Sequence, residues 1–530
     1  MNTMQQFIQS GKAVLGIEFG STRIKAVLIN PKGEILSTGI YDWENQFINE
    51  VWTYSQEEIW HGLQGAYADL ASNVRSQFGV PIRKLAAIGI SGMMHGYLPF
   101  DKDANLLTPF RTWRNNFTSK SAEKLTALFN HNIPQRWSIA HLYQAILNNE
   151  PHVAELDFFT TLAGYVHWQL TGEKVLGIGD ASGMFPIDIA KQDYDQSMLA
   201  QFDSLISDKN YPWKINTLLP KVLSAGKMAG KLTTLGAKLL DLTGNLEAGV
   251  SFCPPEGDAG TGMVATNSIA ETTGNISAGT SAFAMIVLEK NLSRVYPELD
   301  LVTTPAGKLV AMAHANNCST DINAWMKIFE QNLQVFGVYV TKEELFEALF
   351  NQALQGEPNC GGLLSYGFYS GEHNVGLEHG CPMLFHPTNA EFNLANLIRV
   401  HLYSAFAAMK IGMDILIQQE NVQIRQILGH GGMFKTPKVA AQILASALNI
   451  PVATQSSAGE GGAWGIALLA NFLNYANKKS LEQYLNHIFK IQQIHIAQPD
   501  LATHLGYQNF IDLYKKGIDV VKQAVETNLH

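Results

Sequence analysis

The chain has 530 residues, of which 46% are hydrophobic and 16% are charged, with a net charge of −9 and a pI near 6.0. This length exceeds what one hydrophobic core organises, so two large domains are expected. The acidic balance argues against binding to a nucleic-acid backbone, which needs clustered Lys and Arg.

The first predicted element is a β-hairpin over residues 14–29, two β-branched apolar runs joined at Gly20-Ser21-Thr22. Such a bend exposes backbone N–H groups and two hydroxyls, which suits phosphate oxygens. Glu18 precedes the bend, where its carboxylate can bind Mg²⁺ directly or through water. The alternative for Glu18 is an edge-strand carboxylate in solvent.

Strands and helices alternate in the next part of the chain. Ser55 begins a capping box, which predicts a helix to about Val74, and a short strand over residues 85–90 ends in a loop that carries His95. This alternation is typical of an α/β domain with a largely parallel sheet, whose ligands collect beyond the strand ends. His95 there can bind a polyol or be a packed core residue. The polar aromatic loop Trp113-Arg114-Asn115 suits a sugar face.

A helix is predicted over Thr161–Leu170, closed by Gly172, and a loop over Gly179–Gly183. A strand near residue 250 then leads to Asp258, which lies among small residues that let a substrate approach. A carboxylate there can accept a proton from an attacking hydroxyl, and a turn aspartate is the alternative. The domain boundary is expected near residue 265, which gives domains 1–265 and 266–530.

The second half begins with a similar hairpin over residues 276–288, with Gly279-Thr280-Ser281 at its bend. A long apolar helix is predicted over Leu394–Gln418, and a buried strand over residues 424–428 leads to Gly429–Gly432. Residues 457–463 open another helix. Glycines at these helix starts can let the backbone pass against a flat ring such as adenine, or they can form ordinary turns.

The two hairpins together indicate a duplicated fold that grips a polyphosphate. No G-x-x-x-x-G-K-[ST] segment and no G-x-G-x-x-G segment opening a helix is present, so a Walker-type fold is disfavoured. Phosphoryl transfer needs positioned phosphates, a metal and a proton acceptor. The hairpins, Glu18 and Asp258 supply candidates for each.

These motifs resemble those of the FGGY carbohydrate kinases, and most closely the xylulokinases among them, over nearly the whole chain. Residues 18–22 are similar to the family's first phosphate motif, D-x-G-T-[TS], and residues 279–281 to its second. Residues 257–259 match the loop of its catalytic base, and residues 88–96 its sugar loop. Residues 180–183 and 369–372 are also similar to family loops. The resemblance implies an α/β, two-domain actin/Hsp70-like (ribonuclease H-like) ATPase fold with a cleft between the lobes.

The resemblance further implies a cytoplasmic, ATP- and Mg²⁺-dependent sugar kinase, with an N-terminal sugar-binding domain and a C-terminal nucleotide-binding domain. Asp258 is then the catalytic base, and Glu18 faces the metal. The ATP-binding residues implied are Gly20, Ser21, Thr22, Arg23, Gly279, Thr280, Ser281, Gly431, Gly432, Lys435 and Glu460. The sugar-binding residues implied are Met94, His95, Trp113, Arg114, Asn115 and Asp258.

Four departures from the family pattern cluster around the sugar more than the nucleotide. Glu18 replaces an Asp, Met93 replaces the Gln of G-Q-M-H-G, and Trp113-Arg114-Asn115 stands where W-N-D is usual. The family's lysine-centred signature is missing around residues 134–141. These changes favour a shifted sugar preference, with L-ribulose or another ketopentose as an alternative to D-xylulose.

Two other functions stay open on the sequence. The same fold also serves chaperones and filaments, so a catalytically impaired nucleotide- and sugar-binding sensor is one alternative. Glycoside hydrolysis by Glu18 and Asp258 is the other, but it leaves the paired hairpins unexplained.

The cysteines Cys253, Cys318, Cys360 and Cys381 are scattered, which predicts neither a zinc site nor a disulfide framework. The N-terminus lacks the pattern of a signal peptide, and no apolar run approaches about 18 residues. A soluble protein without a membrane or nucleic-acid partner is expected, and a homodimer is compatible with the sequence.

Overall fold

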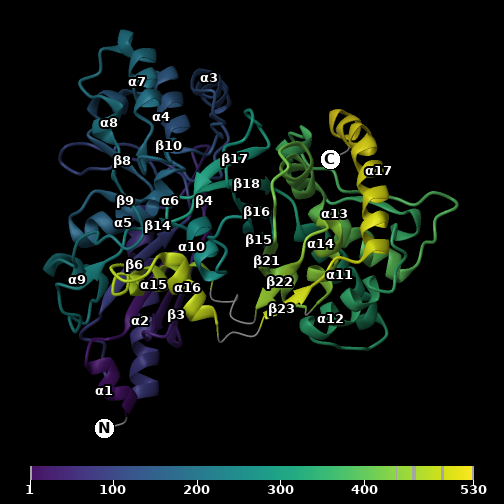
Figure 1. Cartoon of the computed structure of the whole chain (residues 1–530), viewed down its shortest axis with the longest axis horizontal. Helices are drawn as coiled ribbons and strands as arrows, with labels where there is room; N and C mark the ends of the chain where they lie inside the picture. The colour runs from purple at the N-terminus through teal and green to yellow at the C-terminus, as the bar shows by residue number, and fades with distance from the viewer. Residues whose placement is uncertain (1–2, 437, 456–460, 491–493, 528–530) are drawn as a thin grey trace. The chain divides into compact units, whose positions relative to one another are not determined.

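The computed structural model describes residues 3–436, 438–455, 461–490 and 494–527, and it divides into two compact units (Figure 1). Unit 1 comprises Met1–Ile269, Asp300–Val310 and Glu460–Ile491. Unit 2 comprises Ala270–Leu299, Ala311–Gly459 and Gln492–His530.

The main sheet of unit 1 has six strands in the order β13, β6, β1, β2, β3, and β14 also pairs with β6. The hairpin strands β1 and β2 are antiparallel, whereas β6 runs parallel to β1 and to both β13 and β14. The carboxyl ends of β1, β6 and β14 therefore meet at one edge of the sheet. The strands are β1 (Val14–Phe19), β2 (Arg23–Ile29), β3 (Ile35–Asp42), β6 (Ala87–Gly92), β13 (Ser251–Phe252) and β14 (Glu256–Gly257).

Helices α2 (Gln56–Phe78) and α15 (Gly461–Phe472) cover opposite faces of this sheet. A Cβ on Gly16 of β1 would lie 2.2 Å from the carbonyl oxygen of Ala463 in α15, and one on Gly39 of β3 would lie 2.3 Å from the carbonyl oxygen of Ala66 in α2. The strand register places Gly16 and Gly39 on different faces. Glycine at both positions is what allows the two helices to approach the sheet this closely.

The rest of unit 1 consists of helices and two-stranded pairings, with α7 and α8 at one end of the unit and α1 at the other (Figure 1). Their bounds are α1 (Thr3–Gln9), β4 (Gln46–Ile48), β5 (Val51–Thr53), β7 (Leu98–Phe100), α3 (Ser119–Phe129), α4 (Ser138–Leu147), β8 (Phe158–Thr160), α5 (Leu162–Thr171), β9 (Val175–Gly177), α6 (Ile178–Ala181), β10 (Ile187–Asp188), β11 (Asp193–Tyr194), α7 (Gln196–Leu205), α8 (Ile215–Leu218), β12 (Lys221–Leu223), α9 (Thr234–Leu240), α10 (Asp258–Ala265) and α16 (Leu481–Phe489).

The second large sheet has seven strands in the order β17, β18, β16, β15, β21, β22, β23. Its hairpin β15–β16 is antiparallel, and β21 runs parallel to both β15 and β22, so the hairpin-then-parallel arrangement of unit 1 recurs. The strands are β15 (Thr273–Ala278), β16 (Ala282–Val287), β17 (Leu299–Thr303), β18 (Leu309–Ala315), β21 (Gln426–His430), β22 (Val452–Gln455) and β23 (Ile494–Ala497). The other elements of unit 2 are α11 (Ser319–Val335), α12 (Lys342–Ala353), β19 (Leu364–Tyr366), β20 (Met383–Phe385), α13 (Leu394–Asp414), α14 (Val439–Leu448) and α17 (Leu501–Glu526).

Helix α13 and the turn after it form the core of unit 2. By length and composition the stretch Leu394–Gln419 could cross a membrane, but 89% of its most apolar window is buried within the protein. Lys410 pairs with Asp414, which also lies 3.2 Å from the partly exposed Lys515, and Arg399 donates to the backbone carbonyls of Ala353 and Gly356. The stretch is the long apolar helix predicted from the sequence over Leu394–Gln418, and its interspersed charges keep every uninterrupted apolar run shorter than about 18 residues. Its burial identifies it as a core helix.

Most of the local predictions are confirmed. Both hairpins form, Ser55 caps α2 by accepting from the amide of Glu58, and α5 begins after the cap Thr161 and ends at Gly172. The segment Gly179–Gly183, predicted as a loop, instead begins inside the short helix α6. Four residues give too little periodicity for a helix to be recognised.

Candidate active site

The bend of the β1–β2 hairpin directs its backbone carbonyls toward donors in unit 1. The amide of Gly20 donates to the carbonyl of Arg23 at 2.9 Å. The carbonyl of Gly20 accepts from Nε1 of Trp43 at 2.7 Å, and that of Ser21 accepts from the hydroxyl of Tyr54 at 2.5 Å. The two aromatic rings stack with centroids 4.0 Å apart, so both donors are held in place.

The bend of the β15–β16 hairpin is fixed in the same way within unit 2. The amide of Gly279 donates to the carbonyl of Ser281 at 2.9 Å. The carbonyl of Gly279 accepts from the amide of Ser319 at 3.0 Å, and the carbonyl of Thr280 accepts from the amide of Cys318 at 2.9 Å. Here the donors are backbone amides at the start of α11 rather than aromatic side chains.

Each bend therefore keeps donors available at its tip. Among the described residues, none accepts a hydrogen bond from the amides or hydroxyls of Ser21, Thr22, Thr280 and Ser281. A Cβ on Gly279 would have no atom of the protein within 4 Å, so this tip faces open space. Paired amides and hydroxyls around such a space fit the oxygens of a polyphosphate.

Glu18 lies on β1 beside the N-terminus of α15. Its Oε2 accepts from the amide of Ala463 at 3.1 Å, and a Cβ on Gly462 would lie 2.2 Å from its Oε1. Burial raises the pKa of this carboxyl to about 7, and the negative charge of Asp258 adds to the rise. Half-buried and held by helix amides, Glu18 is not the solvent-exposed edge carboxylate of the alternative interpretation.

The described residues contain no cluster of three or more acidic, His or Cys side chains arranged around a metal ion. A single carboxylate beside phosphate-binding amides still fits Mg²⁺, which usually keeps several waters and takes its other ligands from substrate phosphates. Glu18, on the strand that enters the first bend, is the candidate for such a carboxylate.

Asp258 is the first residue of α10, directly after β14. Its Oδ1 accepts from the amide of Met94 at 3.1 Å and from that of Ala259 at 2.9 Å. Burial raises the pKa of the Asp258 carboxyl, although these two hydrogen bonds oppose the rise. Because β1, β6 and β14 are neighbours and parallel, Glu18, Met94 and Asp258 lie at the same edge of the sheet.

His95 has a left-handed backbone, with a φ of 71°, and is followed by Gly96 with a φ of 92°. A non-glycine residue in this region costs on the order of 1 kcal/mol, and such strain concentrates at functional sites. The ring is buried, and its Nδ1 lies 3.2 Å from the carbonyl oxygen of Gly183. Burial and the charge of Arg136 lower its pKa well below the ordinary value, so the imidazole is neutral.

The loop Trp113-Arg114-Asn115 packs on the β4–β5 hairpin through Trp52. The side chain of Asn115 accepts from the amide of Trp52 at 2.9 Å and donates to its carbonyl at 2.8 Å. The guanidinium of Arg114 lies 4.0 Å from the centre of the Trp52 ring. The polar atoms of Asn115 are thus committed to the backbone, whereas Trp113 and Arg114 keep exposed surface.

Two buried carboxyls next to Asp258 were missed by the sequence interpretation. Oδ2 of Asp180 accepts from the hydroxyl of Thr161 at 2.6 Å, and its backbone amide donates to Glu256 at 2.9 Å. Burial raises the pKa of Asp180 to about 7, and Asp258 contributes its charge. The similarity of residues 180–183 to a family loop was the available signal for Asp180. Glu256 had none beyond its position two residues before Asp258.

The remaining residues of the predicted nucleotide site differ in how they are placed. Gly431 has a φ of 97°, and a Cβ there would lie 2.6 Å from the carbonyl oxygen of Ala278, directly before the second bend. Within unit 2 the glycine pair Gly431–Gly432 therefore lies beside that hairpin, while Lys435 is exposed nearby. The Arg23 side chain pairs with Asp42 at 2.7 Å. Glu460 lies outside the described residues.

Known protein families match both parts of the chain. The C-terminal domain of the FGGY family of carbohydrate kinases matches residues 274–473, and the N-terminal domain of that family matches residues 13–253. The chain is 25% identical over 520 residues to a xylulose kinase of Haemophilus influenzae, which covers 94% of this chain and 98% of that protein.

Solved structures agree on the fold. A ligand-bound xylulose kinase from Lactobacillus acidophilus superposes with a TM-score of 0.79 at 16% identity, covering 96% of this chain and 98% of the other. A gluconate kinase from the same organism superposes with a TM-score of 0.78 at 17% identity over the same shares. The structure thus has the actin/Hsp70-like ATPase fold of these kinases.

Proposed function

Because the chain belongs to the FGGY family of carbohydrate kinases and is therefore a sugar kinase, we propose that it transfers the γ-phosphate of ATP to a terminal hydroxyl of a ketopentose-like sugar. The sugar class proposed is that of D-xylulose or L-ribulose. The relatives named xylulose kinase support this class at identities of 20–25%.

The observation that carries the proposal is the setting of Asp258. Two backbone amides hold one oxygen of its carboxylate, and burial raises its pKa, which makes it a stronger base than an exposed Asp. It shares the sheet edge with Glu18 and Met94. This is the position from which a carboxylate can receive a proton from a hydroxyl that attacks phosphorus.

The proposed reaction balances without a covalent intermediate. As the sugar oxygen attacks, its O–H proton passes to the carboxylate of Asp258, and the new O–P bond forms. The bond between the γ-phosphorus and the β,γ-bridging oxygen breaks, and ADP leaves with the electron pair. Little covalent chemistry is required of the protein beyond this proton transfer, so positioning of the two substrates dominates catalysis.

We assign the phosphates of ATP to Gly20, Ser21, Thr22 and Arg23 in unit 1, and to Gly279, Thr280 and Ser281 in unit 2. The adenosine is assigned to Gly431, Gly432, Lys435 and Glu460. Mg²⁺, held by Glu18 and water, would neutralise the charge of the phosphate oxygens.

The sugar is proposed to contact Met94, His95 and the loop Trp113-Arg114-Asn115. Because Nδ1 of the neutral His95 ring donates to the carbonyl of Gly183, Nε2 is left as an acceptor for a sugar hydroxyl. Arg114 is stacked on Trp52 and stands where the family pattern W-N-D has Asn, and Asn115 stands where it has Asp. The site thus gains a cation and loses an acid. The sugar preference is therefore expected to differ from that of a typical xylulokinase.

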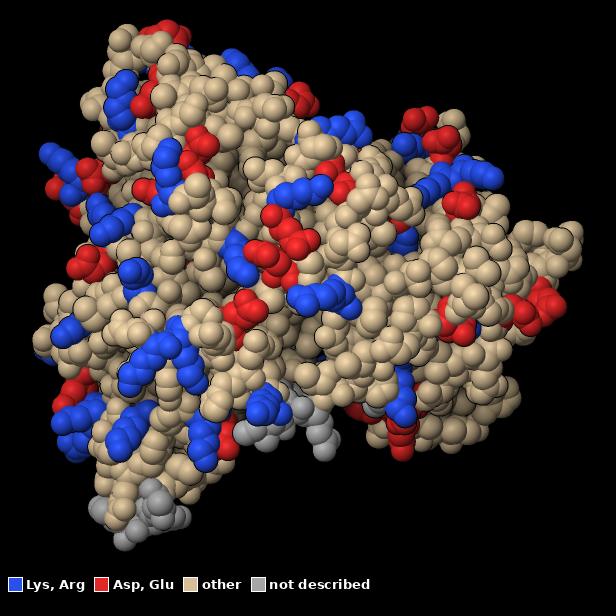
Figure 2. Space-filling view, in the orientation of Figure 1, with Lys and Arg blue, Asp and Glu red and all other residues tan. Residues whose placement is uncertain are grey.

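We further propose that residues 1–265 bind the sugar and residues 266–530 the nucleotide, in a soluble, cytoplasmic protein. Lys and Arg are interspersed with Asp and Glu over most of the face in Figure 2, and this agrees with the proposal that no nucleic acid is bound there. No membrane partner is proposed, and a homodimer is the assembly to test by size-exclusion chromatography with light scattering.

The test is ADP release by the purified chain with Mg²⁺, ATP and one candidate sugar at a time. The panel is D-xylulose, L-xylulose, D-ribulose, L-ribulose, glycerol and gluconate. We expect the highest kcat/KM for a ketopentose, with ADP formed in proportion to the sugar consumed.

Other outcomes point to other functions. Nucleotide binding without turnover of any sugar would favour the sensor, and release of free sugar from a glycoside would favour hydrolysis. A preference for glycerol or gluconate would keep the kinase and refute the ketopentose class.

A further inference from the structure

The second phosphate hairpin is braced by a corner of unit 2 to which no role has yet been assigned. The corner is Asn316–Ser319, between the end of β18 and the start of α11. Its amides at Cys318 and Ser319 donate to the carbonyls of Thr280 and Gly279 at 2.9 and 3.0 Å. The orientation of the bend therefore depends on where this corner is held.

Two side chains of the corner tie it to the loop Tyr369–Glu372: Nδ2 of Asn316 donates to the carbonyl of Gly371 at 2.8 Å, and Asn317 makes the larger set of contacts. Its Oδ1 accepts from the amides of Tyr369 and Ser370, both at 2.9 Å, and from the Ser370 hydroxyl at 3.2 Å. Its Nδ2 donates to the carbonyl of Ser370 and to Oε2 of Glu372, both at 3.2 Å. All the hydrogen-bonding capacity of this amide is thus used within one loop.

Glu372 completes the brace from the loop side. Its Oε2 also accepts from the backbone amide of Asn317 at 3.1 Å, so the corner is bound through both main chain and side chain. The residue has no exposed surface, and burial raises the pKa of its carboxyl to about 7. A buried carboxyl is costly unless it has a structural or functional use, and its contacts here lead to the hairpin.

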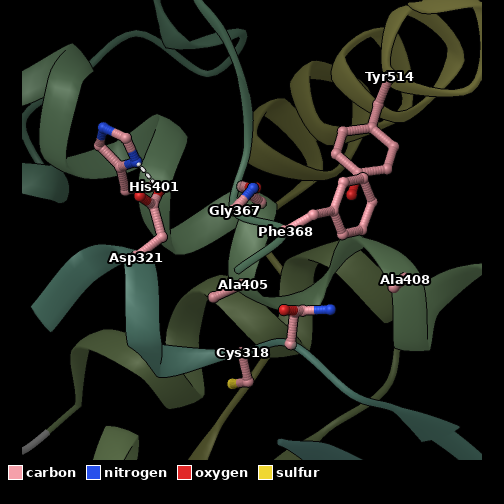
Figure 3. Close-up of a pocket in the computed structure, with 10 residues that line it drawn as sticks. Cys318, Asp321, Gly367, Phe368, His401, Ala405, Ala408 and Tyr514 are labelled. Carbon is pink, nitrogen blue, oxygen red and sulfur yellow. Dashed lines mark hydrogen bonds and ion pairs between the residues drawn. The ribbon is translucent and has the colours of Figure 1, made fainter. Parts of the chain in front are cut away.

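A pocket beside the corner is too narrow to hold a water molecule (Figure 3). Asn317, Cys318 and Asp321 line it together with Phe368 and His401. Figure 3 shows Asp321 joined to His401, at 2.8 Å, away from Cys318. The corner residues Asn317, Cys318 and Ser319 are buried, so their hydrogen bonds are formed away from solvent, where the loss of one is costly.

We propose that Asn317 and Glu372 are positioning residues that hold the Gly279-Thr280-Ser281 bend in its phosphate-binding form. They act through Cys318 and Ser319 and do not themselves touch the nucleotide. That the bend binds the phosphates of ATP rests on the proposed function. That Asn317 and Glu372 hold the bend in place does not depend on it.

Two variants and their controls test the brace in the full chain. Asn317→Ala removes every side-chain hydrogen bond of Asn317 and leaves that of Asn316, and Glu372→Ala leaves the backbone amide of Asn317 without its acceptor. Glu372→Gln keeps an oxygen acceptor at the same distance from the backbone, so this variant should behave much like the wild type. Glu420→Ala is the matched control, since that carboxylate also accepts three hydrogen bonds inside unit 2, from Ser293 and Tyr296.

The first measurement is amide hydrogen exchange without ligand. We expect the amides of Cys318 and Ser319 to exchange about tenfold faster in both alanine variants, in line with the loss of a buried hydrogen bond. Glu372→Gln and Glu420→Ala should leave them protected. Unchanged protection in Asn317→Ala would overturn the brace, whether or not the protein binds ATP.

The second measurement compares the Kd of a non-hydrolysable ATP analogue with that of adenosine, and the KM of ATP with that of the sugar. Asn317→Ala should weaken the ATP analogue about tenfold and leave adenosine and the sugar unchanged. Equal losses for the analogue and adenosine would refute a phosphate-positioning role. If the wild-type protein bound no nucleotide, the proposed function would be refuted. The hydrogen-exchange result would then be the only test of whether Asn317 and Glu372 hold the bend.

Discussion

The two hairpin bends have the same backbone plan but different surroundings. In unit 1 the carbonyls of the bend are held by the side chains Trp43 and Tyr54, and the carboxylates Glu18 and Asp258 lie at the same sheet edge. In unit 2 the carbonyls are held by backbone amides of the corner, and Ser277 stands two residues before the bend, where the first hairpin has Glu18.

This difference indicates a division of work in a duplicated fold. Acids, which can hold a metal or accept a proton, occur in unit 1, whereas the second bend offers only donors for anions. The first bend should therefore affect the chemical step and the second mainly nucleotide affinity.

The largest expected effect is that of Asp258→Asn. An amide cannot accept the hydroxyl proton, so kcat should fall by about 10³-fold, within the range measured for general bases. The Kd of ATP should change little, because no phosphate-binding residue is altered. Initial rates of ADP formation at saturating sugar give the measurement.

Asp241→Asn is the control for that variant. Asp241 is also a buried carboxylate of unit 1, but its oxygens accept from Thr243 and Leu246 at the end of α9. Its removal should lower stability and not kcat. Comparable kcat losses in the two variants would mean that the effect of Asp258 is structural.

Glu18→Gln should have the next largest effect, about a hundredfold in kcat/KM, because the charge that faces the metal is lost. The Mg²⁺ concentration needed for half-maximal rate should rise as well. Glu18→Asp keeps the charge and restores the residue usual in the family, so it should retain most activity. An unchanged Mg²⁺ dependence in Glu18→Gln would remove Glu18 from the metal site.

Substitution of Gly279 and of Gly20 by alanine distinguishes an effect on ATP binding from an effect on the stability of the fold. In Gly279→Ala the new methyl group meets no protein atom within 4 Å, so the free energy of unfolding should change by less than about 0.5 kcal/mol. The methyl would occupy the space for phosphate, so the KM of ATP should rise about tenfold.

Gly20→Ala serves as its counterpart, since that Cβ would lie 3.0 Å from the carbonyl oxygen of Arg23 and should cost about 1 kcal/mol of stability as well. Thermal unfolding and ATP saturation curves distinguish the two variants. An unaffected KM in Gly279→Ala would show that nothing binds at the second tip.

The smallest effect concerns acid stability, which should be lost first in unit 1. Burial lowers the pKa of His141 to about 3 and those of His131 and His167 to about 4. Unfolded histidines titrate near 6.5, so the unfolded state binds more protons between these values. Stability is therefore present above pH 6.5 and decreases as pH falls toward 4.

His141→Phe tests this directly, because neither ring nitrogen of His141 has a hydrogen-bond partner among the described residues. Between pH 7 and pH 5 the variant should lose about 2 kcal/mol less stability than the wild type. Urea unfolding at several pH values gives the slopes, and hydrogen exchange resolves the two units. Identical slopes would contradict the assignment of a buried neutral imidazole.

Local patterns made the fold largely predictable. The hairpins, the cap at Ser55 and the buried helix from Leu394 follow from residue spacing within one element. Asp258 was predictable because its neighbours are small and its loop resembles a family motif.

Contacts between distant segments could not be predicted in this way. The support of Glu18 by Ala463 joins residues far apart in the chain, and Asn115 is committed to Trp52 through backbone groups that carry no sequence signal. Asp180 belongs to a four-residue helix and reaches Thr161 only in the folded chain. Such tertiary contacts decide which polar residues remain available to a substrate.

The most direct test of the central claim is the fate of the γ-phosphate, followed by ³¹P NMR during turnover with the preferred sugar. The account predicts a phosphomonoester on the terminal carbon of the sugar, formed together with ADP, and its absence in Asp258→Asn. Inorganic phosphate as the sole phosphorus product besides ADP, at the same rate with and without sugar, would contradict it.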